Sequence, residues 1–211
     1  EHFSGVLVTD GYAAYGKYAQ QRPGVTPANC WAHTRRQFER AKEAEPAAVA
    51  EVLEIIGELY LIEREIREKQ LDGEAKLQYR QKKSSLVVEA FWQWCENQRN
   101  RMELLPSNPL AKALRYAFER AHELQVFLGD PDVPIDTNHL ERALRPIPMG
   151  RKNWLFCWTE VGARHVGIVQ SLLTTCRLHG VNPYHYLVDV LQRVDQHPAS
   201  GAEQLTPRRW K

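Results

Sequence analysis

The run Phe3-Ser4-Gly5-Val6-Leu7-Val8-Thr9 ends in Asp10, and this junction sets the fold class of the amino-terminal part of the chain. A short apolar run rich in β-branched residues predicts a buried strand, with Asp10 at its carboxyl end. A short helix is predicted next, because Pro23-Gly24 marks a turn after it, and residues 25–33 contain a second short strand. We therefore expect the order strand, helix, strand, helix, which is typical of an α/β domain.

Length and composition are those of an ordinary globular protein. The chain has 211 residues, of which 43% are hydrophobic and 26% are charged, enough for one sizeable domain or a domain that carries an insertion. No window approaches the roughly 18 apolar residues of a membrane helix, and the amino terminus does not resemble a signal peptide, so we expect a cytoplasmic protein without a membrane partner. The net charge of +2 does not by itself demand a polyanionic partner.

The four cysteines are scattered along the chain, at Cys30, Cys95, Cys157 and Cys176. Without close pairing or a secretion signal they are predicted to be reduced thiols. Cys30 and His33 form half of a zinc motif, but no second Cys/His pair stands nearby to complete four ligands. A zinc site and a pair of core residues at a strand end both stay open, and the second interpretation is favoured.

Residues 46–129 read as a helical insertion within the α/β domain formed by residues 1–45 and 130–196. Helix formers dominate this region, Leu71-Asp72-Gly73 interrupts the first long helix, and a later helix is predicted over Leu110 to Leu128. Just before the region, Thr34 and Gln37 match a capping box that would start a helix. The first long helix carries an apolar seam for packing against another helix, made of Val52, Ile55, Leu59, Ile62 and Ile66.

The carboxyl-terminal part returns to the α/β domain through a loop at residues 129–134. The segment after this loop starts a helix that presents Glu141 and that ends abruptly at Pro146. Helical patterns follow at about residues 161–178 and 184–194. From His197 to the end, Pro, Ser, Gly and polar residues predict a loose C-terminal tail.

Asp10 and Glu141 are the candidate catalytic and metal-binding residues. Phosphodiester chemistry benefits from two divalent cations about 4 Å apart, which carboxylates on separate elements can hold. The alternative is structural, because an Asp after a strand often forms a turn and a Glu with Arg145 four residues on often forms a surface ion pair. For Asp136 and Asn138, helix capping is the favoured interpretation.

A basic cluster follows Glu141 and consists of Arg142, Arg145, Arg151 and Lys152. Such a cluster suits contacts with nucleic-acid phosphates, where Arg and Lys supply affinity and position. A solvated basic face is the alternative, and for the neighbouring Trp154 burial in a core is favoured over stacking on a base.

Five segments in order resemble the DDE-type transposases of bacterial insertion sequences, specifically those of insertion-sequence family sixty-six. They cover nearly the whole chain. They are Thr-Asp-Gly-Tyr-Ala-Ala-Tyr at 9–15, Cys-Trp-Ala-His-Thr-Arg-Arg-Gln-Phe at 30–38, Asp-Thr-Asn-His-Leu-Glu-Arg-Ala-Leu-Arg-Pro at 136–146, Gly-Arg-Lys-Asn-Trp-Leu-Phe at 150–156, and Gly-Val-Asn-Pro-Tyr-His-Tyr-Leu at 180–187.

This resemblance implies a partial ribonuclease-H-like fold, predominantly helical overall, with a large helical insertion. It carries over Asp10 as the second acidic residue of the catalytic triad and Glu141 as the third. It further implies two Mg²⁺ or Mn²⁺ ions, cleavage and strand transfer on DNA at transposon ends and target, work as a homo-oligomer, and association with the bacterial nucleoid when DNA is bound.

The sequence departs from the family in one respect. The first catalytic Asp is expected on a strand upstream of Asp10, and the given sequence does not include that strand. We therefore expect this chain not to be competent for transposition alone. One alternative is a non-catalytic DNA-binding or regulatory remnant of a transposase, which the missing Asp favours. Another is a metal-independent helical scaffold that associates through the Val52-to-Ile66 seam.

Overall fold

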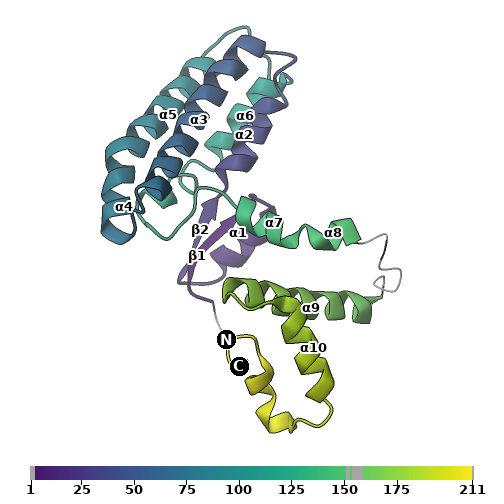
Figure 1. Ribbon diagram of the computed structural model, residues 1–211. Helices are drawn as coiled ribbons and strands as arrows, with labels where there is room; N and C mark the ends of the chain where they lie inside the picture. Colours follow the sequence, from purple (N-terminus) through teal and green to yellow (C-terminus); the bar gives the residue numbers. More distant parts are fainter. Residues whose placement is uncertain (1–2, 151–152, 154–158, 211) are drawn as a thin grey trace. The chain divides into compact units, whose positions relative to one another are not determined.

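The computed structural model describes residues 3–150, 153 and 159–210, and it is predominantly helical with two parallel strands (Figure 1). The predicted predominance of helix is confirmed. The chain forms two compact units, Glu1–Asn138 and His139–Lys211, which we call the first and second units. Each unit is described by itself.

The first unit starts with a parallel βαβ unit. Strand β1 (Gly5–Thr9) and strand β2 (Val25–Asn29) pair in register from Gly5 opposite Val25 to Thr9 opposite Asn29, and helix α1 (Ala13–Gln20) connects them. Parallel strands need such a crossover, and a helix is its usual form. The order predicted from the sequence, strand, helix, strand, helix, is confirmed. The prediction that the first strand is buried is wrong, because Gly5 is exposed and the other residues of β1 are half-buried.

Helices make up most of the rest of the first unit. Pro46 and Pro109 stand in the first turns of two of them, and Asn108 Oδ1 accepts a hydrogen bond from the Leu110 N–H (2.8 Å). The elements are α2 (Trp31–Glu39), α3 (Pro46–Glu68), α4 (Gly73–Tyr79), the π-helix η1 (Arg80–Ser84), α5 (Ser85–Arg99), α6 (Pro109–Phe118) and the 3₁₀ helix η2 (Val126–Leu128).

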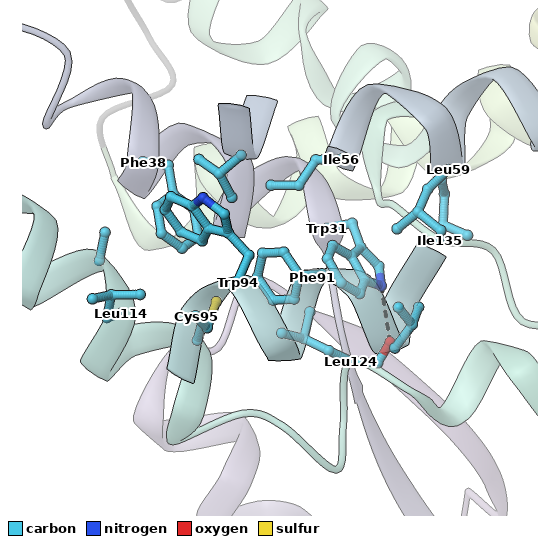
Figure 2. Packing of buried hydrophobic residues seen from close by; sticks show 14 of the residues in the cluster. Trp31, Phe38, Ile56, Leu59, Phe91, Trp94, Cys95, Leu114, Leu124 and Ile135 are labelled. Atoms are coloured by element: carbon cyan, nitrogen blue, oxygen red, sulfur yellow. Dashed lines mark hydrogen bonds between the residues drawn. The ribbon is translucent and has the colours of Figure 1, made fainter. Parts of the chain in front are cut away.

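Large aromatic side chains from α2 and α5 fill the core of the first unit (Figure 2). The Trp31 and Phe91 rings meet edge to face with centroids 5.0 Å apart, and Phe38 contacts Phe91 in the same way at 5.9 Å. The α3 seam lies against this core, with Val52 and Leu59 almost fully buried. The seam is thus satisfied within the chain, which removes the basis for a scaffold that associates through it.

Helix α2 begins earlier than the capping-box pattern predicts, so that prediction is wrong. The first helical residue is Trp31, and Thr34 is completely buried inside the helix. The early start follows from contacts made with distant segments. The Trp31 N–H donates to Ile135 O (2.9 Å), and the Trp31 Nε1–H donates to Leu124 O (2.8 Å).

Helix α6 ends at Phe118, although a helix was predicted as far as Leu128. The carbonyls of Glu123 and Leu124 accept hydrogen bonds from the Asn29 N–H (3.0 Å) and the Trp31 indole. Turns therefore replace the helix where the chain passes the end of β2.

A fully buried arginine, Arg80 of η1, holds the loop that follows the helices. Its guanidinium forms two hydrogen bonds with the Glu63 carboxylate (2.8 and 2.9 Å). It also donates to the carbonyls of Phe127, Asp130 and Val133 at 2.9–3.1 Å. Because an unpaired buried charge is costly, this complete set of partners fixes the loop that leads toward residues 135–138.

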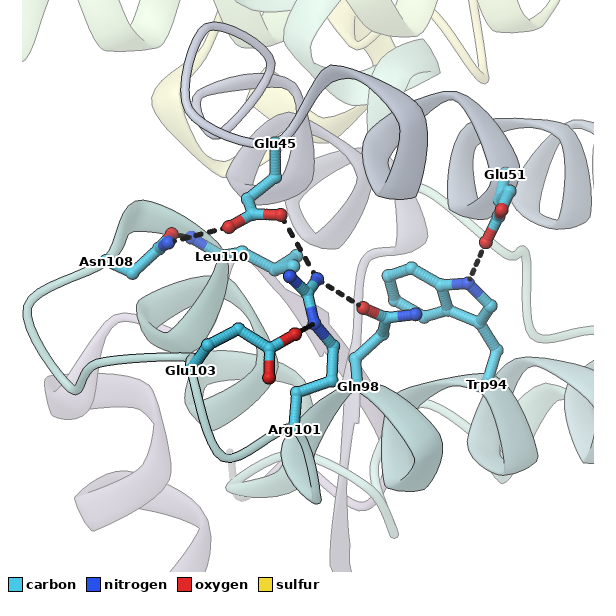
Figure 3. A network of polar contacts seen from close by, with 8 residues as sticks. All are labelled: Glu45, Glu51, Trp94, Gln98, Arg101, Glu103, Asn108 and Leu110. Carbon is cyan, nitrogen blue, oxygen red and sulfur yellow. Dashed lines mark hydrogen bonds and ion pairs between the residues drawn. The ribbon is translucent and has the colours of Figure 1, made fainter.

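A second polar network closes the connection between α5 and α6 (Figure 3). Glu45 accepts hydrogen bonds from Arg101 (3.1 Å) and from the Asn108 amide (2.9 Å). On the neighbouring turn, the Trp94 indole donates to Glu51 (2.9 Å). These contacts tie the start of α3 to both later helices.

Helix α7 (Asn138–Leu144) spans the boundary between the units, and the second unit continues with α8 (Pro146–Gly150), α9 (Glu160–Leu178), α10 (Pro183–Arg193) and the 3₁₀ helix η3 (Ala199–Leu205). The two predicted helical patterns near 161–178 and 184–194 are confirmed. The predicted loose end is wrong: Leu205 is buried, its carbonyl accepts from the Tyr186 hydroxyl (2.7 Å), and the Trp210 indole donates to Asp189 (2.7 Å).

Candidate functional site

Asp10 lies directly after β1, as the sequence predicts, and it is exposed. Its Oδ1 accepts a hydrogen bond from the Tyr12 N–H (3.0 Å), which shapes the turn into α1. Asp10 is therefore a turn former, the structural role that we weighed for it. A carboxylate has about four lone-pair directions, so this bond leaves capacity for a cation.

Hydrogen bonds bring the segment before α7 to the carboxyl ends of both strands. The Cys30 N–H at the end of β2 donates to Thr9 O at the end of β1 (3.0 Å). Cys30 Sγ in turn accepts from the backbone N–H and the hydroxyl of Thr137 (3.3 and 3.4 Å). The Asp10 turn and residues 135–137 thus share one edge of the sheet, the edge at which open α/β sheets generally bind ligands.

The capping interpretation of Asp136 is confirmed. Its Oδ1 accepts from the N–H of Asn138, the first residue of α7 (3.0 Å), and its Oδ2 accepts from the Asn138 side-chain amide (2.6 Å). The pKa of Tyr60 is raised, chiefly because the side chain is buried and to a smaller extent because the Asp136 carboxylate lies nearby. Asp136 and Asn138 therefore act on the start of α7.

Glu141 lies in the first turn of α7 and is exposed, as are Arg142 and Arg145. Asp10 belongs to the first unit and Glu141 to the second, so their convergence on one metal site stays a prediction. Arg151 and Lys152 of the basic cluster, and Trp154 beside it, lie outside the described residues. Within 3–150, 153 and 159–210, no group of three or more His, Cys, Asp or Glu side chains is arranged to hold a metal ion.

Cys30 is buried and bonded to Thr137, in agreement with the interpretation of a core residue at a strand end. Cys95 and Cys176 are also buried free thiols, which confirms the predicted reduced state for these three cysteines. Cys157 lies outside the described part of the chain.

Two side chains that contact the Asp10 turn could not be predicted from the sequence. The Tyr116 hydroxyl donates to Asp10 O (2.8 Å), and Arg120 Nη2 donates to Gly11 O (3.3 Å). These pairs are more than 100 positions apart, and no local pattern links such residues. A cavity of about 410 Å³ adjoins the turn, lined in part by Thr9, Tyr12 and Arg120.

The parallel βαβ unit and the helices that follow it define a predominantly helical protein with a small parallel sheet. Residues 1–165 match the Transposase IS66 family, and residues 171–208 match the IS66 C-terminal element. The chain therefore belongs to the IS66 family of transposases, as the five sequence segments predicted.

Curated relatives match along almost the whole chain. The uncharacterized protein y4qI of Sinorhizobium fredii is 36% identical over 217 residues, which cover 99% of this chain and 40% of the relative. The uncharacterized proteins y4jD and y4hP of the same organism are 33% and 31% identical, each over 99% of this chain and 42% and 40% of the relative. This chain thus spans about two fifths of the length of these relatives.

No solved structure matches the chain. In the part of the chain that the structure describes, none of the helices combines the length and the apolar character needed to cross a bilayer.

Proposed function

We propose that this chain forms the part of a DDE-type transposase that carries the second and third carboxylates of the catalytic site, Asp10 and Glu141. The proposed reaction is metal-dependent cleavage of DNA and strand transfer on a ribonuclease-H-like fold, with residues 46–129 inserted. One observation carries it beyond family membership. The Asp10 turn and the segment that leads into the Glu141 helix are hydrogen-bonded at the same strand ends, through Thr9, Cys30 and Thr137.

The two carboxylates fit the donor chemistry of Mg²⁺ or Mn²⁺. These ions prefer oxygen ligands, and Mg²⁺ uses few from the protein because it keeps water or substrate phosphate in its shell. Both Asp10 and Glu141 are exposed, and the turn bond of Asp10 leaves oxygen lone pairs for a cation. When bound, two such ions activate an attacking oxygen and stabilise the leaving one in an in-line displacement. Asp10 and Glu141 would hold them.

Paramagnetic broadening by Mn²⁺ tests this assignment on the chain itself. Asp10→Asn is expected to abolish Mn²⁺ broadening of amide signals around residue 141, and Glu141→Gln to abolish it around residue 10, because a shared ion needs both carboxylates. Asp195→Asn, which changes an exposed carboxylate of the second unit, is the matched control and is expected to change neither. Independent responses at the two sites would contradict the shared site.

DNA is the proposed partner, gripped through its phosphates by Arg142, Arg145, Arg151 and Lys152. The test is the salt dependence of DNA binding, measured by fluorescence anisotropy. Each phosphate contact contributes about 0.9 to the slope of log K against log salt concentration on duplex DNA. Arg142→Ala and Arg145→Ala are each expected to lower the slope by about one.

Arg64→Ala, at an exposed arginine of α3, is the control for this measurement. An unchanged slope in both test variants would remove these arginines from the DNA surface. Steep salt dependence combined with no metal response at Asp10 would instead favour the non-catalytic remnant. We further propose that the complete transposase acts as a homo-oligomer, which sedimentation on paired DNA ends would test.

A further inference from the structure

The helical region of the first unit contacts the Asp10 turn through two residues, one near the end of α6 and one just past it. Tyr116 lies near the end of α6, and its hydroxyl donates to the carbonyl of Asp10 (2.8 Å). Arg120 lies just past that end, and its Nη2 donates to the carbonyl of Gly11 (3.3 Å). Two successive peptide groups of the turn are thus held by side chains from a segment more than 100 positions away.

Tyr116 and Arg120 also hold each other. The Arg120 guanidinium carbon lies 3.8 Å from the centre of the Tyr116 ring, and Arg120 Nη1 donates to Tyr116 O (3.1 Å). Stacking of this kind favours Arg over Lys, because the planar guanidinium covers the ring face.

Gly11 is shaped for this contact. Its φ of +84° lies in the left-handed region that favours glycine, and a Cβ built there would lie 2.4 Å from Arg120 Nε. The guanidinium therefore approaches the turn across a surface that only glycine leaves open. Arg120 Nε is buried there and has no hydrogen-bond partner among the described atoms.

We propose that Tyr116 and Arg120 are positioning residues, which hold the Asp10 carboxylate in place by clamping the backbone of the Asp10–Gly11 turn. The inference rests on the proposed function, in which Asp10 binds metal. The end of α6 and the residues just after it would then help to set the position of the Asp10 carboxylate. A change in α6 is then felt at the metal site through the backbone of the turn.

The test compares Tyr116→Phe with Tyr186→Phe. Both changes delete a tyrosine hydroxyl that donates to a backbone carbonyl, at 2.8 Å in the first unit and 2.7 Å in the second. The first measurement is the hydrogen-exchange rate of the Tyr12 amide, which is bonded to Asp10 Oδ1. Tyr116→Phe is expected to speed this exchange about fivefold, the size of one lost hydrogen bond. Tyr186→Phe is expected to leave it unchanged.

Arg120→Lys is a second variant, which keeps the charge but loses the planar stack and the fork of donors, and a similar increase is expected. Unchanged Tyr12 exchange in both Tyr116→Phe and Arg120→Lys would overturn the inference, whatever the protein does with metal. The second measurement is the Mn²⁺ affinity at Asp10, expected to weaken about fivefold in Tyr116→Phe and to stay constant in Tyr186→Phe.

The two measurements separate this inference from the proposed function. If the unmodified chain shows no Mn²⁺ broadening that Asp10→Asn removes, the metal assignment of Asp10 fails, while faster Tyr12 exchange still supports the clamp on the turn. If Mn²⁺ binds through Asp10 but both measurements are insensitive to Tyr116→Phe and Arg120→Lys, the site stands and the clamp is wrong.

Discussion

The two units of this chain bury their apolar residues to very different extents. In the first unit, Trp31, Phe38 and Phe91 are completely buried and interlock edge to face. In the second, Cys176, Tyr186 and Leu205 are buried, yet many apolar side chains of its helices stay exposed, among them Leu144, Val161, Ile168, Leu178 and Leu191. Helices of similar regularity therefore differ in what stabilises them.

The difference teaches that helix formation and core formation are separate outcomes of a sequence pattern. Apolar residues at helical spacing predict α3 and α9 alike, but only α3 has α5 and α2 to cover its apolar face. Since buried apolar area is the main source of stability, we expect the first unit to unfold at higher denaturant than the second. Hydrogen exchange followed by mass spectrometry in urea resolves the two transitions.

The largest effect is expected from Arg80→Met. Losing this arginine leaves Glu63 as a buried charge without its partner and three carbonyls of the 127–133 segment without a donor. Breaking such a buried pair costs about 3–5 kcal/mol. The unfolding free energy of the first unit is expected to fall by that amount, while the urea midpoint of the second unit stays unchanged.

Arg99→Met is the control for this change, because Arg99 pairs with Glu96 on the surface and is more than half exposed. Exposed pairs contribute about 0–1 kcal/mol, and the stacking of Arg99 on the Phe118 ring about 0.5–1 kcal/mol, so a loss well below that of Arg80→Met is expected. Equal losses of unfolding free energy in Arg80→Met and Arg99→Met would contradict the distinction between the units. A loss in both units of Arg80→Met would contradict it as well.

A comparison of two buried leucines, one in each unit, tests the same difference between the units. Leu114 in the first unit is 2% exposed and Leu205 in the second is 7% exposed. Leu114→Ala is expected to cost about 3 kcal/mol, because the close-packed aromatic core around it cannot collapse into the cavity. Leu205→Ala is expected to cost about half as much, since few apolar side chains of the second unit are buried and its surroundings can relax more readily. Urea unfolding of each unit measures both, and a larger loss for Leu205→Ala would reverse the comparison.

Local patterns predicted the elements of this fold better than their ends. The run before Asp10 and the turn at Pro23-Gly24 were enough for the βαβ unit, because strand and turn preferences act over a few residues. The start of α2 and the end of α6 were missed, because both depend on hydrogen bonds of Trp31 with residues 124 and 135. The docked tail was missed for a similar reason, since Leu205 meets Tyr186 only after folding.

Some residues of the candidate site could likewise be predicted from local sequence, and others could not. Asp10 could be predicted from its place after a strand, and Asp136 from its place before a helix. Tyr116 and Arg120 could not, since nothing near them in sequence reveals that they contact Asp10 and Gly11.

The smallest effect is a pH dependence that belongs to the first unit. The pKa of the Cys95 thiol is raised in the folded state, chiefly because the thiol is buried and to a smaller extent because of the Glu96 charge. A raised pKa means that the folded state keeps the proton which the unfolded chain loses above about pH 8.5. The stabilisation is therefore complete below that pH and is lost as pH rises. The loss amounts to about 1 kcal/mol between pH 8 and pH 9.5.

Cys95→Ala removes this titration, so the unfolding free energy of the first unit is expected to fall less over the same range, although its value at pH 7 is lower because of the cavity. The comparison must therefore be made between slopes. Some slope remains at still higher pH, because burial also raises the pKa of Tyr60. Identical slopes for the unmodified chain and Cys95→Ala would mean that the thiol is not held protonated by the core. The tightly packed interior that sets the first unit apart would then be more open to water around α5 than its aromatic contacts indicate.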